Sequence, residues 1–261
     1  MLKLKYLFEN FDLARKCMEF YECDMASVDE MLRYFRISSN AIYPFQSKRG
    51  GRICFLRLSP VEEKKLDDVK SEICLMEWLI DKGFPAMRPV PMKDGKLFGQ
   101  INTEWETYNV SCFEKVSGNS LEDTKGTLQI VKGYGKTLGE LHALMKEYPY
   151  SEERRNHKML LCEIEERMQK YGASEIVRKE FDDVYKELER LPLSTSDYGV
   201  IHYDFEPDNV FYDEKEESFS VIDFDDAICC WYALDVVRAL DALDEVIEDI
   251  SMEEAIASFL E

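Results

Sequence analysis

The stretch GVIHYDFEPDNVFYDEKEESFSVIDFDD, residues 199–226, carries the densest set of polar side chains that suggest chemistry. Two short apolar runs flank a polar turn within it, a pattern that predicts a pair of antiparallel strands. Asn209 precedes the first run and Asp223 follows the second, so the two side chains should lie at one end of the hairpin, beside a loop with Asp204. Oxygen-only ligands of this kind suit a hard cation such as Mg²⁺, which keeps waters and shares phosphate oxygens.

The spacing of these residues resembles that of kinase-like enzymes. His202-x-Asp204 is followed after four residues by Asn209, and then by an apolar strand that ends at Asp223. Together with Ile-Asp-Phe-Asp-Asp at 222–226, this pattern is most similar to the aminoglycoside phosphotransferase and choline kinase superfamily. Within it, the bacterial homoserine kinase-like, stress-response and spore-coat-associated branches are the most similar. Without that resemblance, the same residues predict only a buried polar hairpin with acidic turns.

The resemblance covers roughly residues 34–235 and is specific only around 202–226. It implies an α+β, bilobal protein kinase-like fold, with an antiparallel-sheet N-lobe and a mainly helical C-lobe. Residues 1–116 would form the nucleotide-binding lobe with its N-terminal helices, and residues 117–261 the catalytic lobe.

The composition describes a globular chain. Of its 261 residues, 45% are hydrophobic, and no run approaches the ~20 apolar residues that cross a bilayer. Residues 1–9 contain no sustained apolar run or small-residue cleavage site. The eight cysteines form no CxxC pair, so a reducing cytoplasm is the expected location. We therefore expect neither a membrane span nor a disulfide framework.

The charge of the chain limits its partners. Thirty-three basic against 53 acidic residues give a formal net charge of −20, which argues against nucleic acid as a partner. This charge would favour a cationic small molecule, but solubility is the simpler explanation of the net charge alone. The sequence does not indicate an oligomeric state.

Hydrophobic periodicity predicts the order of the elements. We expect helices within 1–33, three strands between 34 and 58, a helix over 66–82, a hairpin around Asp94-Gly95, a strand over 108–116 and a long helix over 128–148. Two charged helices, 160–171 and 175–191, would either line the acceptor site, as helices around the C-lobe do in the resembled family, or form a solvated face. The apolar run 227–243 and the acidic end 244–261 are both predicted to be helical.

The resemblance also implies how the nucleotide is bound. Ser38, Ser39 and Asn40 stand where the phosphate-covering loop belongs, without its usual glycines, so an ordinary hairpin turn is the alternative there. Arg57 occupies the strand position of the phosphate-binding lysine, and Glu72 is its expected partner on the following helix.

In the resembled fold, the hinge between the lobes lies near Glu114 and Val116, so backbone groups there would pair with adenine.

The implied reaction moves the γ-phosphoryl group of ATP to a hydroxyl of a small acceptor, such as an aminoglycoside or a choline-like alcohol. Asp204 would accept or orient the proton of the hydroxyl, while Asn209 and Asp223 would hold Mg²⁺. His202 is expected to brace the loop, and Tyr203 stands where the family usually has glycine.

Several assignments stay open. Asp225 and Asp226 would attract a substrate ammonium group or accept backbone hydrogen bonds. His142 is interpreted as a structural histidine and Asp235 as a structural hydrogen-bond acceptor. A protein Ser/Thr kinase of the stress-response type would share every motif, and a non-catalytic nucleotide-binding or structural protein is a further alternative.

Overall fold

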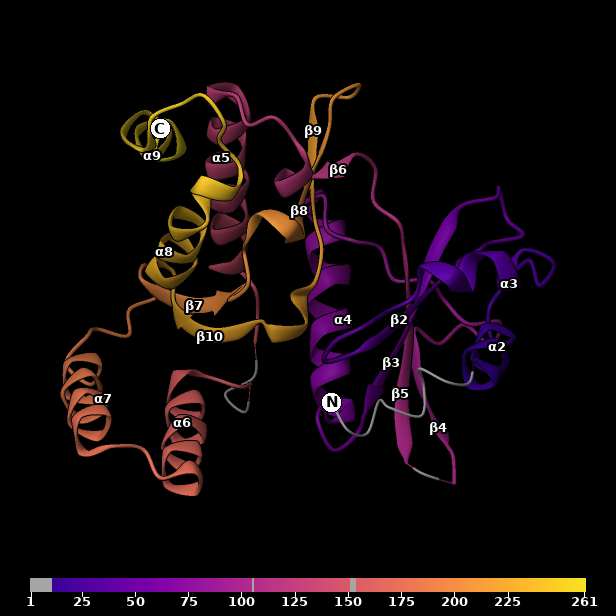
Figure 1. The fold of residues 1–261 in the computed structure, drawn as a ribbon, viewed down its shortest axis with the longest axis horizontal. Helices are drawn as coiled ribbons and strands as arrows, with labels where there is room; N and C mark the ends of the chain where they lie inside the picture. The colour runs from indigo at the N-terminus through magenta and orange to yellow at the C-terminus, as the bar shows by residue number, and fades with distance from the viewer. Residues whose placement is uncertain (1–10, 105, 151–153) are drawn as a thin grey trace. The chain divides into compact units, whose positions relative to one another are not determined.

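The computed structural model describes residues 11–104, 106–150 and 154–261 (Figure 1). The expectations for residues 1–9, and the part of the helical prediction that precedes residue 11, lie outside this described part. The chain forms two compact units. Unit 1 comprises Met1–Asn119 and Phe211–Asp225, and unit 2 comprises Ser120–Val210 and Asp226–Glu261. The lobe boundary that the resemblance implies, between residues 116 and 117, stays a prediction.

Unit 1 is built on a five-stranded antiparallel sheet. Its strands, in spatial order, are β1 (Arg36–Ile37), β2 (Ala41–Gln46), β3 (Ile53–Pro60), β5 (Thr107–Glu114) and β4 (Phe98–Asn102). The strands predicted over 34–58 and 108–116 are therefore confirmed. Of the hairpin predicted around Asp94-Gly95, only the second arm is a strand, β4, and Val90 instead bonds to Cys112.

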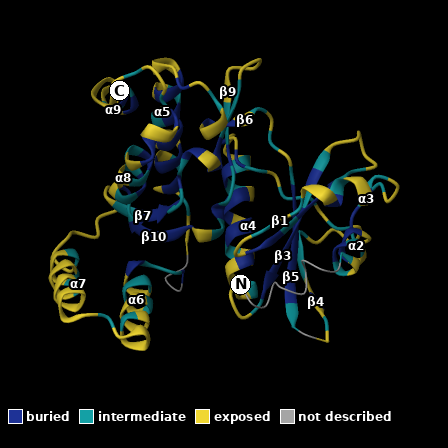
Figure 2. Ribbon diagram, viewed as in Figure 1, coloured by how far each residue is buried: buried dark blue, intermediate teal, exposed yellow. Residues whose placement is uncertain are grey.

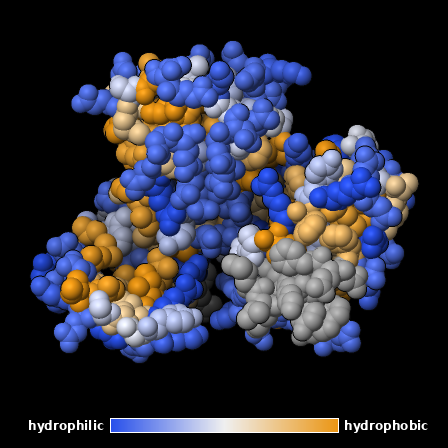
Figure 3. Space-filling model, in the orientation of Figure 1, coloured by the Kyte–Doolittle hydropathy of each residue, from blue (hydrophilic) through white to orange (hydrophobic). Residues whose placement is uncertain are grey.

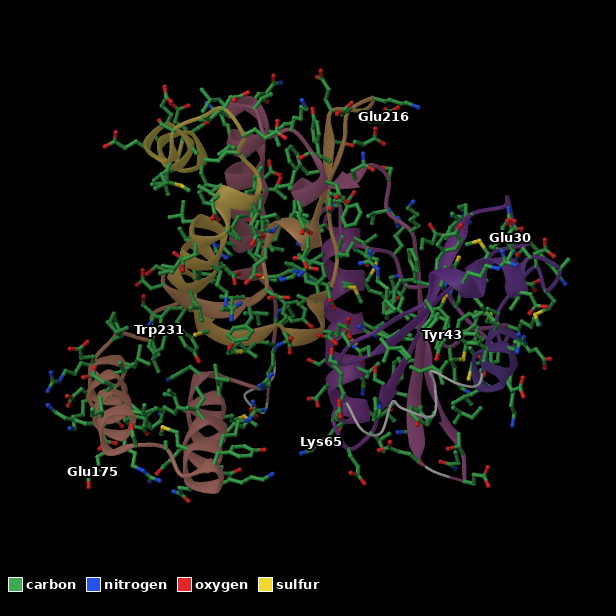
Figure 4. All side chains as sticks on the ribbon, in the orientation of Figure 1. Glu30, Tyr43, Lys65, Glu175, Glu216 and Trp231 are labelled. Carbon is green, nitrogen blue, oxygen red and sulfur yellow. The ribbon has the colours of Figure 1, made fainter. Side chains whose placement is uncertain are left out.

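The two faces of this sheet carry different side chains. Successive residues of a strand point to opposite faces. Leu56 and Leu58 of β3 are fully buried in one apolar cluster with α2 (Asp12–Met18) and α3 (Val28–Met31), which also contains Tyr43 (Figure 4). Arg57 therefore points to the other face, where α4 (Leu66–Asp81) lies. This alternation places the charged side chain of Arg57 beneath a helix. The helix predicted over 66–82 is confirmed as α4.

A second, three-stranded sheet has the order β6 (Asn119–Ser120), β8 (Val210–Asp213) and β9 (Ser218–Val221). The two strands predicted within 199–226 are thus present as β8 and β9. Gly118 has φ of +81°, and an added Cβ would collide with the backbone carbonyl of Tyr212. The change of direction after β5 therefore requires a glycine at this position.

Unit 2 is mainly helical. It contains α5 (Leu128–Met145), α8 (Ala233–Asp241) and α9 (Met252–Phe259), together with a two-stranded antiparallel sheet of β7 (Tyr198–Ile201) and β10 (Ile228–Trp231). The described chain also contains five short 3-10 helices, which are distributed over both units: Leu32–Tyr34, Leu121–Asp123, Pro207–Asn209, Phe224–Asp226 and Leu243–Glu245.

Two predicted boundaries in unit 2 are wrong. The apolar run 227–243 begins as strand β10, because its residues pair with β7 from Ile228 opposite Ile201 to Trp231 opposite Tyr198. A short apolar run cannot be assigned to helix or strand by periodicity alone, and the pairing with β7 decides it. The acidic end is helical only over α9, where Ser251 and Glu254 form a capping box.

The helices α6 (His157–Tyr171) and α7 (Glu175–Leu188) form a hairpin around Gly172, which has a left-handed conformation. No residue of α7 is buried, as Figure 2 shows by the exposed surface along its length. Several of the exposed residues of α7 are apolar: Ile176, Val177 and Val184. Figure 3 shows hydrophobic surface in the region of this hairpin. In the part of the chain that the structure describes, no helix combines the length and apolar character needed to span a membrane.

Two glycines of α5 provide a matched test of its packing against α9. At Gly135, an added Cβ would meet the backbone carbonyl of Phe259, whereas at Gly139 nothing lies within 4 Å. Gly139→Ala should stabilise the protein by about 0.5–1 kcal/mol, because alanine favours the helix. Gly135→Ala should instead destabilise it by about 1–2 kcal/mol, since α9 must move away. Urea unfolding of both variants measures the two signs; stabilisation by Gly135→Ala would contradict the packing.

Candidate active site

The loop between β7 and β8 carries the predicted catalytic residues, and Asp235 of α8 holds it in place. Asp235 is fully buried, and its carboxylate accepts the backbone N–H groups of His202 at 2.9 Å and Tyr203 at 2.7 Å. The same carboxylate contacts Nε2 of His142 at 3.0 Å. Asp235 is thus a hydrogen-bond acceptor, as expected, and the contact of His142 agrees with its interpretation as a structural histidine.

His202 is fully buried, and its Nδ1 accepts the backbone N–H of Asp204 at 3.3 Å. This geometry agrees with the expectation that His202 braces the loop.

Both carboxylate oxygens of Asp204 have neighbours in unit 2. Asn209 donates from Nδ2 to Oδ2 of Asp204 at 2.9 Å and to its backbone carbonyl at 3.0 Å. Nη1 of Arg238, on α8, lies 3.5 Å from Oδ1 of Asp204 and 2.9 Å from a carboxylate oxygen of Glu206. The Asp204 side chain remains 36% exposed, so the carboxylate is oriented but still open to a reactant.

Tyr203 has φ of +72°, in the left-handed region that favours glycine. A non-glycine residue there costs about 1–3 kcal/mol, which neighbouring contacts must offset. Two contacts do so: the backbone N–H bond to Asp235, and the guanidinium of Arg238, 4.5 Å above the centre of the tyrosine ring. The tyrosine is therefore accommodated by residues of α8.

This loop is strongly acidic. Burial raises the pKa of Asp208, and the nearby carboxylates of Asp204 and Glu206 raise it further. Arg238 offsets part of this negative charge through its contacts with Asp204 and Glu206.

Replacing Arg238 should therefore impair turnover more than folding. We expect Arg238→Gln to lower kcat roughly 5–10-fold, about 1 kcal/mol, because the pair is about a third exposed and partly screened by water. Steady-state kinetics with an acceptor identified by screening measures this, with Arg190→Gln, an exposed arginine two residues after α7, as the control. An unchanged kcat in Arg238→Gln would show that the guanidinium does not act on Asp204.

In unit 1, Arg57 and Glu72 form the ion pair that the resemblance implies. Nη1 and Nη2 of Arg57 face the two carboxylate oxygens of Glu72 at 2.9 and 2.5 Å, and Nε donates to Ser111 at 3.2 Å. The two side chains are only 3% and 2% exposed. Their contribution to nucleotide binding stays a prediction.

Asp225 lies next to this ion pair, 3.8 Å from Nη1 of Arg57, and has hydrogen-bond partners of its own. Its carboxylate accepts from Nζ of Lys64 at 2.8 Å and from Nδ2 of Asn40 at 2.8 Å, and Ser59 donates to the side-chain oxygen of Asn40 at 2.6 Å. Burial would raise the pKa of Asp225, but Lys64 and Arg57 outweigh it, so the pKa lies below its usual value. Asp225 therefore acts here as a hydrogen-bond acceptor for unit 1 side chains.

The three residues of the predicted phosphate-covering loop differ in their surroundings. Asn40 is buried in the network around Asp225, whereas Ser38 and Ser39 are exposed. The serine hydroxyls thus lie at the surface, while the asparagine amide holds Asp225.

Asp223 has φ of +61° and lies beside this network. Burial and the neighbouring charge of Asp225 raise its pKa to about 7. A bound divalent cation would stabilise the charged form of Asp223, and the oxygen donors of Asn209 and Asp223 are of the kind that fits Mg²⁺. Among the described residues, no group of three or more His, Cys, Asp or Glu side chains could hold a metal ion without other ligands.

The hinge residues lie at the end of β5. Glu114 donates its backbone N–H to the carbonyl of Arg88 at 2.9 Å, and its carboxylate pairs with Arg52 at 2.5 Å. Val116 follows two residues later and is partly buried.

The predicted residues thus fall into two sets. Unit 1 contains Asp223 and the nucleotide-binding set Ser38, Ser39, Asn40, Arg57, Glu72, Glu114 and Val116, whereas unit 2 contains His202, Asp204 and Asn209. That Asn209 and Asp223 hold one metal ion stays a prediction.

Sequence reasoning missed two charged residues of these sets. Lys64 lies in a run of charged residues after β3, where nothing distinguishes it from a solvated lysine. Arg238 lies three positions after Asp235, and this helical spacing places both on one face of α8. That spacing is the signal that could have placed Arg238 beside the loop that Asp235 holds.

Comparisons with known proteins agree with this fold. A solved structure of an amicoumacin kinase in complex with AMP-PNP, Ca²⁺ and Ami superimposes with a TM-score of 0.84 at 19% identity, covering 99% of this chain and 78% of that one. The chain thus has the α+β fold of kinase-like phosphotransferases. Residues 38–258 match the model of the phosphotransferase enzyme family, APH, and the chain belongs to that family.

Curated relatives are more distant in sequence. The amicoumacin kinase of Bacillus subtilis (strain 168) is 21% identical over 210 residues, which are 79% of this chain and 61% of that protein. The homoserine kinase of Caulobacter vibrioides (strain NA1000 / CB15N) is 25% identical over 189 residues, 68% of this chain and 55% of that protein. The chain therefore spans 55–61% of the length of these relatives.

Proposed function

We propose that this protein transfers the γ-phosphoryl group of ATP to a hydroxyl group of a small-molecule acceptor. The observation that carries the proposal is the loop after β7 in a chain of the phosphotransferase family. There the carboxylate of Asp204 is oriented by Asn209 and remains open to a reactant. Phosphoryl transfer requires positioning and charge stabilisation more than covalent chemistry by the protein, and an oriented carboxylate can supply the positioning.

Each predicted residue has a role in this proposal. Asp204 orients the acceptor hydroxyl and takes its proton. Asn209 and Asp223 would hold Mg²⁺, which neutralises charge on the β- and γ-phosphates when bound. Arg57 supplies positive charge from the sheet, fixed by Glu72.

The rest of the nucleotide would be bound by the surface serines and the hinge. Ser38 and Ser39 would cover the phosphates with backbone N–H groups and hydroxyls. Backbone groups near Glu114 and Val116 would pair with adenine.

The acceptor we favour is small and cationic, such as an aminoglycoside or a choline-like alcohol. The acidic loop around Asp204, Glu206 and Asp208 supports a positively charged acceptor. A reducing, cytoplasmic location fits eight cysteines that are all free thiols.

An ATP-consumption screen tests the proposal. The acceptor panel comprises aminoglycosides, choline, ethanolamine, homoserine, sugars and generic protein substrates, each with Mg²⁺. Turnover with a small hydroxyl compound that is lost in Asp204→Asn supports the proposal. Transfer of labelled phosphate to protein alone would instead identify a protein Ser/Thr kinase. Thermal stabilisation by ATP–Mg²⁺ without turnover on any acceptor would indicate a non-catalytic nucleotide-binding protein.

A further inference from the structure

The guanidinium of Arg57 is already committed to protein partners. Its two terminal nitrogens face both oxygens of Glu72, and its third nitrogen donates to Ser111. The side chain is 3% exposed and lies beneath α4. Turning this group toward a ligand would break a buried bidentate pair, which is costly because it leaves the carboxylate without its partner.

Lys64 offers a second cation a short distance away. Nζ of Lys64 lies 2.8 Å from Oδ2 of Asp225 and 2.7 Å from its backbone carbonyl, and 3.8 Å from Glu72. An ammonium group has three N–H donors, and these two short contacts occupy two of them. The Lys64 side chain is 12% exposed, four times the exposed fraction of Arg57.

The two residues also differ in mechanical freedom. Arg57 lies within β3, paired with Ile42 on one side and Ser111 on the other. Lys64 lies between β3 and α4, outside any strand or helix, and its ammonium is a compact charge on a flexible stem. It can exchange one acceptor for another without disturbing the sheet.

We infer that Lys64 is the residue that contacts the phosphates of the nucleotide, while Arg57 stays paired with Glu72 and supports it. This inference rests on the proposed function, because it assumes that unit 1 binds ATP. The pair of Arg57 and Glu72 anchors α4, and Asp225 positions Nζ of Lys64 before the nucleotide arrives. The phosphate-binding charge that the resemblance places at Arg57, on β3, is thus supplied by Lys64, in the segment between β3 and α4.

The test compares two neighbouring lysines. Lys65, the N-cap residue of α4, follows Lys64 and is exposed (Figure 4). Calorimetry measures the affinity of the wild type, Lys64→Met and Lys65→Met for ATP–Mg²⁺ and for adenosine. We expect Lys64→Met to weaken ATP–Mg²⁺ binding roughly 10–100-fold, as for one charge-assisted contact, and to leave adenosine binding unchanged. Lys65→Met should change neither affinity.

Each other outcome has a defined meaning. Unchanged ATP–Mg²⁺ affinity in Lys64→Met, or equal losses for ATP–Mg²⁺ and adenosine, would overturn the inference, because a phosphate contact affects only the ligand with phosphates. A wild-type protein that binds no nucleotide would overturn the proposed function and the inference together. Should Lys64→Met fail to fold, Lys64→Gln keeps a donor toward the Asp225 carbonyl and carries the same expectation.

Discussion

Replacing Asp204 by asparagine should lower kcat by about 10²–10⁴-fold, the usual contribution of a positioned general base. The amide oxygen of the new residue can still accept the hydrogen bond that Asn209 donates to Oδ2. The backbone N–H bond to His202 does not involve the changed atoms. The substitution therefore removes the group that takes the proton and leaves the loop that holds it.

Steady-state kinetics with an acceptor identified in the screen measures this loss, and calorimetry measures ATP–Mg²⁺ affinity in parallel. The affinity for the nucleotide should stay within about twofold of the wild type, since Asp204 is assigned to the acceptor and not to the phosphates. Asp223→Asn provides the contrast, because it should weaken ATP–Mg²⁺ binding itself. Equal activity in wild type and Asp204→Asn would rule out the assignment of Asp204 as the base.

Glu72→Gln should destabilise the folded protein by about 3–5 kcal/mol, the typical cost of removing one partner of a buried ion pair. Arg57 would keep its charge at 3% exposure, and the nearby carboxylate of Asp225, 3.8 Å from Nη1, is already paired with Lys64. The neutral amide also cannot accept two charge-assisted hydrogen bonds from the guanidinium fork. Most of the loss is therefore the cost of an uncompensated buried charge.

Urea unfolding at neutral pH measures this change. The double variant Arg57→Met/Glu72→Met is the control: it removes both charges and should recover most of the stability. If Glu72→Gln unfolded at the wild-type urea concentration, the pair would have to be open to water, against its burial in the structure.

How far the sequence predicts this protein differs between its elements. The helices α4 and α5 follow from hydrophobic periodicity, since each buries one face. The strands β2, β3 and β5 follow from short apolar runs bounded by turn residues, and they are buried along most of their length. Residues 228–231 do not, because an apolar run of four residues suits a helix or a strand equally and only β7 decides. The acidic end after residue 244 forms an α-helix only over α9, where the helix packs against α5. Tertiary contacts therefore decide its extent.

The candidate site shows the same division. The spacing of His202, Asp204 and Asn209 is a local property of one loop, so the sequence by itself determined which side chains stand there and to which family the chain is similar. The pairing of Arg57 with Glu72 could be expected from the family pattern as well.

Only the tertiary structure decided which charged side chains complete these groups. Lys64 and Asp225 are 161 residues apart, and Arg238 is 34 residues from Asp204, yet each pair lies in contact. No local pattern encodes such contacts, because they arise when separate strands and helices pack and bring charges that are distant in the sequence together. The sequence thus determined the chemical groups on the loop after β7, and packing determined the partners that orient them.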